Sequence, residues 1–208
     1  MSQDTVTLYH APQTRSSTTL FLLEELGAPY QLHVLSTKKN ENHAPAYLAV
    51  NPLGKVPAIK HRGAIITETV AIMLYLADEF PANGLAPKIG DPLRGPYLRW
   101  MAMYGAAWEP AIIDRANKRE PGMRAVSTYG EFDTLFKVVT DQLVKGPYIL
   151  GEKFSAADVL WGSALTWMTM FKILPEHPAV TAYLARGATR PALARSRAKD
   201  AELTQAAG

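Results

Sequence analysis

The chain has 208 residues, of which 48% are hydrophobic, and this is enough apolar material for one sizeable core or two small ones. Lysine and arginine together outnumber aspartate and glutamate by 22 to 19, an excess too mild to indicate nucleic-acid binding. It lies mainly in residues 186–199, which we expect to form a solvated last helix. Cysteine is absent, which excludes disulfide bonds, thiolate metal sites and cysteine nucleophiles. Any sulfur chemistry must therefore use a sulfur that a ligand supplies.

The N-terminal residues Met1-Ser2-Gln3-Asp4 lack the basic start and apolar core of a signal peptide. The strongest candidate for a membrane span, Val159–Phe171, is an uncharged run well short of the roughly 20 residues needed to cross a bilayer. We therefore expect a cytoplasmic protein with no membrane partner.

Residues 1–80 alternate between strand-like and helix-like patterns. The expected elements are an extended run at Thr5–His10, a helix at Ser16–Leu26, a strand at Tyr30–Leu35, a short helix at Pro45–Val50, a hairpin of Val56–Lys60 and Ala64–Thr67 turned at Arg62-Gly63, and a helix at Glu68–Phe80. This order predicts a small mixed sheet with helices packed against it.

Residues 81–90 hold two prolines and two glycines without a periodic apolar pattern, which is typical of a linker. Beyond them every segment predicts helix, beginning with a cap and a first-turn proline at Asp91-Pro92. Apolar residues recur at helical spacing in three stretches: Tyr97, Met101, Tyr104 and Trp108; Phe132, Leu135, Phe136, Val139 and Leu143; and Leu160, Ala164, Trp167 and Phe171. Ser155 and Asp158 fit a capping box. We expect an α/β domain at 1–80, a linker at 81–90 and an all-helical domain at 91–208.

Three motifs, in this order along the chain, resemble those of the cytosolic glutathione transferases: NPLGKVPAI at 51–59, TETVAIMLYL at 67–76 and FSAADVL at 154–160. The segment KKNENHAPAYLAVNP at 38–52 is similar to one in the bacterial beta class. The resemblance covers nearly the whole chain. It implies a thioredoxin-like α/β N-terminal domain that binds glutathione, an all-α C-terminal domain that contacts a hydrophobic electrophile, no metal, and a homodimer.

Glutathione offers two carboxylates, an α-amino group and backbone amides. The resemblance implies a cis bond at Val56-Pro57, where the backbone of Val56 pairs with the glutathione cysteine like an added strand; the alternative is an ordinary turn proline. It also implies that Glu68 and Thr69, at the start of a helix, hold the γ-glutamyl group, because free N–H groups there favour an anion. The alternative is that these residues only cap the helix.

Lys39 aligns, by its distance from the following motif, with a lysine that contacts glutathione in the beta class. Its neighbour Lys38 is an alternative for the same role. Both lysines are equally consistent with solvated loop charges.

The turn after the first strand departs from the beta class, because an ungapped match places Arg15 where that class has a cysteine. Theta- and delta-like relatives place a serine at the position that Thr14 fills, and Ser16 follows closely. We therefore expect Thr14, Ser16 or their backbone amides to hold the glutathione sulfur, with Arg15 adding a positive charge or pointing into solvent. The alternative for the hydroxyl cluster is helix capping.

The resemblance places the electrophile against the helix that carries Tyr104, Trp108, Glu109 and Ile112. Glu109 stands where the beta class has a histidine, a second departure. Aromatic residues at helical spacing are also typical of core packing.

These features favour an enzyme that ionises glutathione and adds the thiolate to an apolar electrophile. One alternative is a glutathione-dependent disulfide reductase that uses two bound glutathiones and no protein cysteine. Another, from a different class, is a non-catalytic module that binds glutathione or other ligands. A dehalogenase or an isomerase is equally consistent with these residues.

Overall fold

The computed structural model describes residues 4–206. Its internal contacts divide into two compact units, one formed by the chain up to Gly84 together with the chain from Arg190 onward, and the other by Leu85–Thr189. Within the described residues, no helix combines the length and the apolar character that crossing a bilayer requires.

The first unit holds the mixed sheet with its flanking helices. Its elements are β1 (Val6–His10), α1 (Ser16–Leu26), β2 (Tyr30–Val34), the short helices η1 (Glu41–His43) and α2 (Pro45–Leu48), β3 (Ala58–His61), β4 (Ala64–Thr67), α3 (Thr69–Glu79), η2 (Pro81–Asn83) and α9 (Pro191–Ala206). Among the described residues the strands form one four-stranded sheet in the order β2-β1-β3-β4. β1 runs parallel to β2 and antiparallel to β3, and β3 and β4 form the expected hairpin.

The strand register brings several chain turns to one end of the sheet. Tyr9 pairs with Ala58, and Ala58 pairs in turn with Thr67. On the other side of β1, His10 pairs with Val34. The chain leaves β1, enters β3, leaves β4 and leaves β2 at this same edge.

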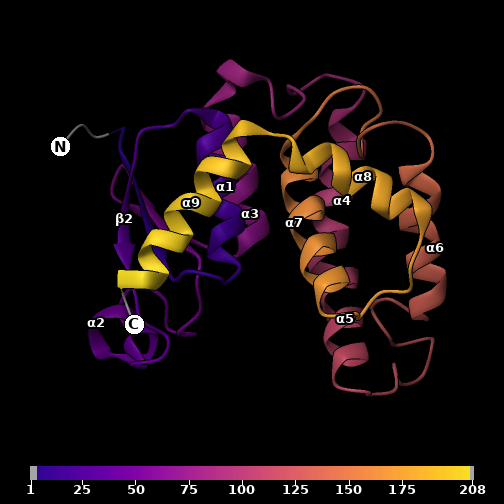
Figure 1. Cartoon of the computed structure of the whole chain (residues 1–208), viewed down its shortest axis with the longest axis horizontal. Helices are drawn as coiled ribbons and strands as arrows, with labels where there is room; N and C mark the ends of the chain where they lie inside the picture. The colour runs from indigo at the N-terminus through magenta and orange to yellow at the C-terminus, as the bar shows by residue number, and fades with distance from the viewer. Residues whose placement is uncertain (1–3, 207–208) are drawn as a thin grey trace. The chain divides into compact units, whose positions relative to one another are not determined.

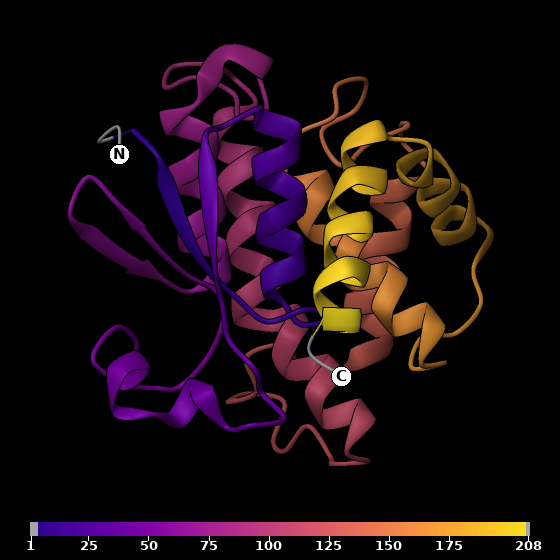
Figure 2. The same ribbon diagram turned by 60° about the vertical axis from the view of Figure 1, so that its left-hand side comes forward.

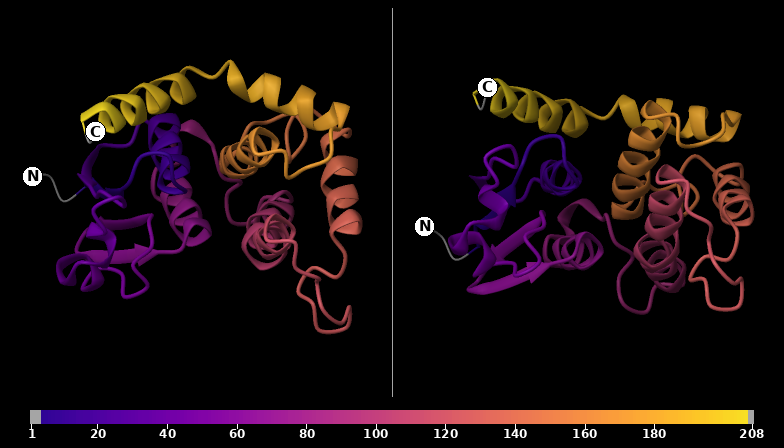
Figure 3. Two further views of the ribbon diagram at one scale, coloured as in Figure 1. Left: turned by 60° about the horizontal axis from the view of Figure 1, so that its bottom comes forward. Right: turned by 90° about the horizontal axis from the view of Figure 1, so that it is seen from below.

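The helices of the first unit form layers against the sheet. α1 packs against β1 and α3, and α9 packs along α1. Figures 1 and 2 show α9 running beside α1, and both views in Figure 3 show α1 between α9 and α3. The core consists of apolar residues from the strands and helices, including Leu8, Leu22, Ile59 and Leu76, each 0% exposed.

The position of α9 corrects the domain boundaries expected from the sequence. The expected helical domain, 91–208, includes this last helix, but its contacts place it in the first unit. The division also falls between Gly84 and Leu85, inside the expected linker, and η2 occupies the start of that linker. Local periodicity identifies a helix but carries no information about which distant surface the helix covers.

Some basic residues at α9 are engaged with α1, so the last helix is only partly solvated: the Arg195 and Lys199 side chains stay 54% and 43% exposed. Arg190 forms an ion pair with Glu25. Arg195 and Lys199 both bind Glu24, at 2.6 and 2.8 Å. The side chain of Glu24 is only 8% exposed. The positive charges of the tail therefore neutralise acidic residues on the outer face of α1.

The second unit is helical, as expected. Its elements are α4 (Arg94–Met103), the π-helical turn η3 (Tyr104–Trp108), α5 (Glu109–Ala116), α6 (Phe132–Leu143), α7 (Ala156–Met170) and α8 (Pro178–Ala188). The expected cap is present ahead of α4, where the Asp91 side chain accepts the N–H of Leu93 at 2.8 Å. The expected capping box is also present: the Asp158 carboxylate accepts the N–H of Ser155 at 2.9 Å.

Trp161 on α7 is the centre of the helical core. Its ring lies 5.2 Å from the ring of Trp108 and 5.4 Å from that of Trp100, and its Nε1 donates to the carbonyl of Trp100 at 3.1 Å. The expected apolar stripe on α7 is wrong at its end, because Phe171 is 60% exposed and stacks on the half-buried Trp167. α7 ends at Met170, so the helical spacing no longer directs Phe171 inward.

Candidate functional site

The candidate site lies in the first unit, at the sheet edge defined by the pairs Tyr9–Ala58 and Ala58–Thr67. Three of the predicted glutathione-binding segments adjoin these paired residues in the chain. They are the turn after β1, the Val56-Pro57 bond just before β3, and Glu68-Thr69 just after β4. The register thus brings together segments that are far apart in sequence.

Thr14 is the partly exposed hydroxyl of the turn after β1. Its Oγ1 donates to the carbonyl of Ala11 at 2.7 Å and accepts the N–H of Ser16 at 3.2 Å. The second bond satisfies a backbone donor at the start of α1, so Thr14 also serves as a cap. Arg15, at the N-cap position, is exposed and makes no side-chain cap bond.

Ser16 faces inward and is 0% exposed. Its Oγ accepts the N–H of Ala11 at 3.1 Å and lies 2.8 Å from Thr14 Oγ1 and 2.9 Å from His10 Nδ1. A hydroxyl that is fully buried and surrounded by partners offers no surface to a ligand sulfur. Of the two hydroxyls expected from the sequence, Thr14 is the one at the surface of the turn.

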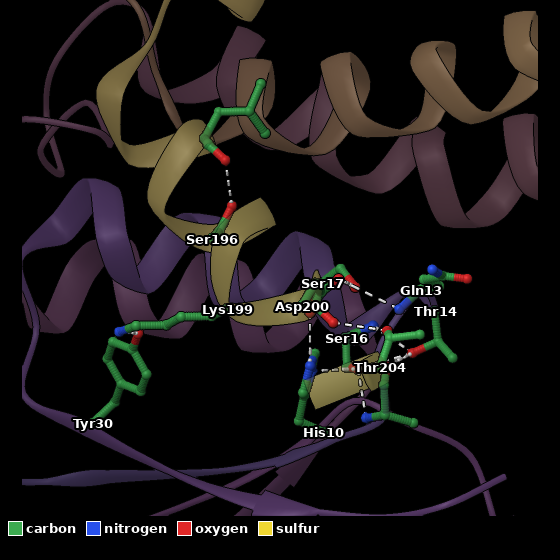
Figure 4. A network of polar contacts seen from close by, with 12 residues as sticks. His10, Gln13, Thr14, Ser16, Ser17, Tyr30, Ser196, Lys199, Asp200 and Thr204 are labelled. Carbon is green, nitrogen blue, oxygen red and sulfur yellow. Dashed lines mark hydrogen bonds and ion pairs between the residues drawn. The ribbon is translucent and has the colours of Figure 1, made fainter. Parts of the chain in front are cut away.

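Asp200 on α9 ties this turn to the C-terminal helix, as Figure 4 shows. Its Oδ1 lies 2.9 Å from Nε2 of the fully buried His10. Its Oδ2 accepts the hydroxyl of Ser17 and the N–H of Gln13, the latter at 3.3 Å. Gln13 has a positive φ of 58°, a conformation that a non-glycine residue adopts uncommonly. The carboxylate therefore holds both the backbone of the turn and the imidazole beneath it.

The pKa of Asp200 is lowered from its ordinary value. Burial works against ionisation, but the hydrogen bonds from His10 and Ser17 and the backbone bond from Gln13 outweigh it. Asp200 is thus a carboxylate at neutral pH. Sequence reasoning missed both His10 and Asp200, since neither residue belongs to a local motif.

The Val56-Pro57 peptide bond is cis, which confirms that part of the prediction. Ladder pairing in β3 begins at Ala58, so the strand expected to begin at Val56 starts two residues later. Pro57 is buried and Val56 is half-buried. The backbone of Val56 thus lies just outside the sheet at its edge.

The loop before Val56 is held by hydrogen bonds to one carbonyl. The Tyr47 hydroxyl and the Asn51 amide both donate to the oxygen of Lys55, at 2.5 and 2.8 Å. Burial raises the pKa of Tyr47 to about 12, so this hydroxyl keeps its proton at neutral pH. Gly54 has φ +62°, and a Cβ there would lie 2.6 Å from the ring of His43. These residues hold the loop that leads to Val56 in place.

Glu68 occupies the N-cap of α3 with φ 66° and ψ 116°. This conformation is strained for a residue with a side chain, and such strain occurs most often at functional sites. The Glu68 side chain is exposed, and the carbonyl of Glu68 accepts the N–H of Ile72 at 2.9 Å. The next residue, Thr69, begins the helix, where the first N–H groups have no intrahelical acceptor.

Lys38 and Lys39 lie in the exposed turn that follows β2 at the same end of the sheet. The N–H of Lys39 donates to Ser36 Oγ at 3.2 Å. The contacts do not distinguish between the two lysines, and the role of Lys39 stays a prediction.

The residues predicted to contact an electrophile belong to the second unit. Tyr104, Trp108 and Ile112 are 5%, 0% and 6% exposed, which is the core packing that the sequence left as an alternative. Glu109 is half-buried, and its Oε1 accepts the Tyr104 hydroxyl at 3.5 Å. The π-helical turn at Tyr104–Trp108 was not predicted. It ends two residues before Pro110, whose missing N–H disturbs the regular helical ladder.

Among residues 4–206, histidine, cysteine, aspartate and glutamate side chains form no cluster of three or more that could hold a metal ion.

The four-stranded mixed sheet, with its cis proline and helix N-terminus at one end, is that of a thioredoxin-like domain, and the chain also holds a helical unit. Family models support the same conclusion: residues 4–78 match the glutathione S-transferase N-terminal domain and residues 110–186 match the C-terminal domain. The chain belongs to the glutathione S-transferase family. This confirms the resemblance and the fold class seen in the sequence.

Individual relatives agree with the family assignment. The chain is 27% identical to glutathione S-transferase GstA of Escherichia coli O157:H7, over 88% of this chain and 93% of that protein. It is 26% identical to the disulfide-bond oxidoreductase YfcG of Escherichia coli K12, over 90% of this chain and 92% of that protein. A sphingomonad glutathione S-transferase solved in complex with glutathione has a TM-score of 0.77 and 26% identity, covering 94% of this chain and 98% of the solved one.

Proposed function

We propose that this protein is a glutathione transferase that binds glutathione at the edge of its sheet, ionises the thiol beside Thr14 and adds the thiolate to a hydrophobic electrophile. The observation that carries the proposal is the row Tyr9, Ala58 and Thr67. This register gathers a hydroxyl, an extended backbone segment and a helix N-terminus at one place, and glutathione requires all three.

The groups at this edge match the functional groups of glutathione one by one. The exposed carboxylate of Glu68 is suited to the α-ammonium group, and the N–H groups at the start of α3 are suited to the neighbouring carboxylate. The backbone of Val56 is suited to pair with the cysteinyl residue as an added strand. A lysine of the following turn, Lys39, is suited to the second carboxylate.

The thiol then lies at the turn that holds Thr14. A free thiol has a pKa of about 8.5, and each unit of depression requires about 1.4 kcal/mol. A hydrogen bond to a charged group contributes about 1.5 to 3 kcal/mol. The N-terminus of α1, which follows the turn, adds about 0.3 to 1 kcal/mol. Together these are sufficient to make the thiolate the major form near neutral pH, without a protein cysteine or tyrosine.

The experiment is a pH titration of bound glutathione, followed by the ultraviolet absorbance of the thiolate, in the wild type and in Thr14→Val, Thr14→Ser and Ser16→Ala. Thr14→Val keeps the shape of the side chain but removes the donor, so it should raise the bound-thiol pKa by about one unit. Thr14→Ser should restore the wild-type value. An unshifted thiol pKa in all four proteins would contradict thiolate activation.

A second candidate is a glutathione-dependent disulfide reductase, which is favoured by the likeness to YfcG and by the absence of cysteine. In this reaction two glutathione thiols are oxidised to one disulfide while the substrate disulfide is reduced to two thiols. Turnover of a small disulfide without turnover of an aryl halide would support it. Retention on a glutathione resin with neither activity would indicate a binding module.

The resemblance also implies a homodimer acting in the cytoplasm. Light scattering of the purified protein tests the dimer directly. The contacts to the electrophile, at Tyr104, Trp108, Glu109 and Ile112, remain a prediction.

A further inference from the structure

A continuous line of polar contacts runs from the surface of the β1–α1 turn to α9 (Figure 4). Thr14 Oγ1 is 2.8 Å from Ser16 Oγ, and Ser16 Oγ is 2.9 Å from His10 Nδ1. On the other side of the ring, His10 Nε2 is 2.9 Å from Asp200 Oδ1. The first two contacts are hydrogen bonds, and the third is an ion-pair contact.

The order carboxylate, imidazole, hydroxyl is that of a serine nucleophile with its base, but burial excludes that use here. Ser16 and His10 are both 0% exposed, so no substrate carbonyl can reach the Ser16 hydroxyl. Of the two hydroxyls in the line only Thr14 is partly exposed, and Asp200 at the other end of the line is half-buried. The line therefore connects a buried base to the hydroxyl that faces the ligand.

We propose that the Asp200–His10 pair is the proton acceptor for the glutathione thiol, reached through the hydroxyls of Ser16 and Thr14. This inference rests on the proposed function, since it takes the sulfur to bind at Thr14. A hydrogen bond from Thr14 stabilises the thiolate but does not say which group takes the thiol proton. The inference names His10 as that group.

The protons balance along the line. Before transfer, the thiol S–H donates to Thr14 Oγ1, Thr14 donates to Ser16 Oγ, and Ser16 donates to the lone pair of His10 Nδ1. Each O–H or S–H bond then breaks as the next one forms, so the sulfur becomes a thiolate and His10 becomes an imidazolium. Afterwards every bond points the other way: His10 donates to Ser16, Ser16 donates to Thr14, and Thr14 donates to the thiolate.

The hydroxyl oxygens remain satisfied in both states. Ser16 Oγ accepts the N–H of Ala11 throughout, and Thr14 Oγ1 accepts the N–H of Ser16 throughout. Each oxygen therefore uses one hydrogen and two lone pairs both before and after the transfer. Without a thiol, Thr14 directs its hydrogen to the carbonyl of Ala11, and the same carbonyl, 3.0 Å from Ser16 Oγ, is an alternative acceptor for the Ser16 hydrogen. The transfer thus requires hydroxyl rotations but no movement of the backbone.

The surroundings of His10 suit a proton acceptor. The charged group that faces the ring is Asp200 from α9, whereas α1 supplies the hydroxyl of Ser16 and β2 places the apolar Val34 opposite in the sheet. The lowered pKa of Asp200 keeps that carboxylate ionised and able to stabilise the imidazolium. Asp200 acts through His10 and through the backbone of the turn at Gln13, so it is a positioning residue.

The first test counts protons in the wild-type protein. Calorimetry of glutathione binding at neutral pH, in buffers with different ionisation enthalpies, gives the number of protons released per site, and thiolate absorbance gives the fraction ionised. S-methylglutathione, which has no thiol proton, provides the baseline. We expect thiolate to form with almost no proton release, because His10 retains the proton. Release of one proton per thiolate would overturn the proposal.

The second test uses variants of the line with a control on the same helix. His10→Gln and Asp200→Asn should reduce the ratio of thiolate to thiol near neutral pH by about tenfold, a shift of one unit in the thiol pKa, and any thiolate still formed should be matched by a released proton. Lys199→Gln removes an ion pair that docks α9 but leaves the line intact, so it should keep the wild-type titration and proton count. Equal effects of Asp200→Asn and Lys199→Gln would overturn the proposal in favour of helix docking.

The two proposals fail differently. Glutathione binding without any thiolate band would overturn thiolate activation and the relay with it. A thiolate band accompanied by full proton release would overturn the relay alone and leave the proposed function standing. Conversion of His10 to an imidazolium on addition of glutathione, followed by the ¹⁵N shifts of its ring, would support the relay directly.

Discussion

Lys199 on α9 and Glu24 on α1 form an ion pair of 2.8 Å. It joins the C-terminal stretch of the first unit to its N-terminal stretch. Glu24 also accepts the Tyr30 hydroxyl, and Arg195 binds its other oxygen. Asp200, next to Lys199, reaches the β1–α1 turn. Glu24 therefore holds α9 beside α1 through more than one basic residue, and the same helix brings Asp200 to the turn.

Replacing Glu24 with Gln should loosen α9. Arg195 and Lys199 are 54% and 43% exposed, so both can return to water, and the loss of unfolding free energy should be about 1 to 3 kcal/mol. Urea denaturation measures this loss, and trypsin cleavage in α9 should become faster. The matched control is Asp141→Asn, which breaks the exposed pair with Lys137 and should change stability by less than about 0.5 kcal/mol. Equal effects of the two substitutions would contradict a docking role for Glu24.

Lowering the pH should remove the contribution of Glu24 to the free energy of unfolding over a defined pH range. Burial opposes ionisation of this carboxyl, but hydrogen bonds from Lys199, Tyr30 and Arg195 prevail and lower its pKa from 4.5 to about 2. A lowered folded-state pKa stabilises the fold above the unfolded value, and this stability is lost as the pH falls toward the folded value. The difference in urea midpoint between wild type and Glu24→Gln should thus be constant above pH 5 and should shrink between about 4.5 and 2. A difference independent of pH would contradict this pKa.

Much of the fold could be predicted from local signals. The helix expected at Ser16–Leu26 has those bounds, because polar turn residues precede an apolar run and Gly27 ends it with φ 61°. The hairpin turn at Arg62-Gly63 and the capping box at Ser155 follow from equally local rules. The glutathione contacts near Val56 and Glu68 were located through the family resemblance, and the register explains why they lie together.

The contacts of α9 could not be predicted in the same way. Asp200 reaches His10 from the opposite end of the chain, and no spacing or motif in the sequence links them. A run of basic residues on a helix has the same pattern whether it faces water or acidic partners such as Glu24. Ser16 is buried against His10, so it offers no surface to a sulfur. The sequence of the turn alone does not show this burial.

Gly54 should tolerate no side chain, because alanine there requires both a left-handed conformation and space that is already filled. Its φ is +62°, and the added Cβ would meet the ring of His43 at 2.6 Å and the carbonyl of Asn42 at 3.0 Å. The control is Gly84→Ala, where φ is +63° but nothing lies within 4 Å. Gly84→Ala should cost about 1 to 2 kcal/mol from the backbone alone, and Gly54→Ala about 1 to 3 kcal/mol more.

The loop that carries Gly54 leads to Val56, so Gly54→Ala should also raise the KM for glutathione, whereas Gly84→Ala should not. Urea denaturation and steady-state kinetics of the two variants check this. Equal stabilities and equal KM values for the two variants would show that the loop shifts to accommodate a Cβ without disturbing the sheet edge.

Substitution of Glu68 should separate backbone strain from ligand binding. Glycine adopts φ 66° and ψ 116° without the steric cost that a Cβ imposes, so Glu68→Gly should raise the unfolding free energy by about 1 kcal/mol. The same variant loses the carboxylate proposed for the glutathione ammonium, and its KM for glutathione should rise at least about tenfold, equivalent to about 1.4 kcal/mol. Stability and affinity should thus change in opposite directions.

Glu68→Gln provides the comparison, because it keeps the backbone conformation and a side chain of the same shape but removes the charge. It should raise the KM for glutathione as Glu68→Gly does while leaving the urea midpoint close to that of the wild type. If both variants bind glutathione normally, the strain at the start of α3 serves the fold rather than the ligand, and the ammonium must be bound by another group.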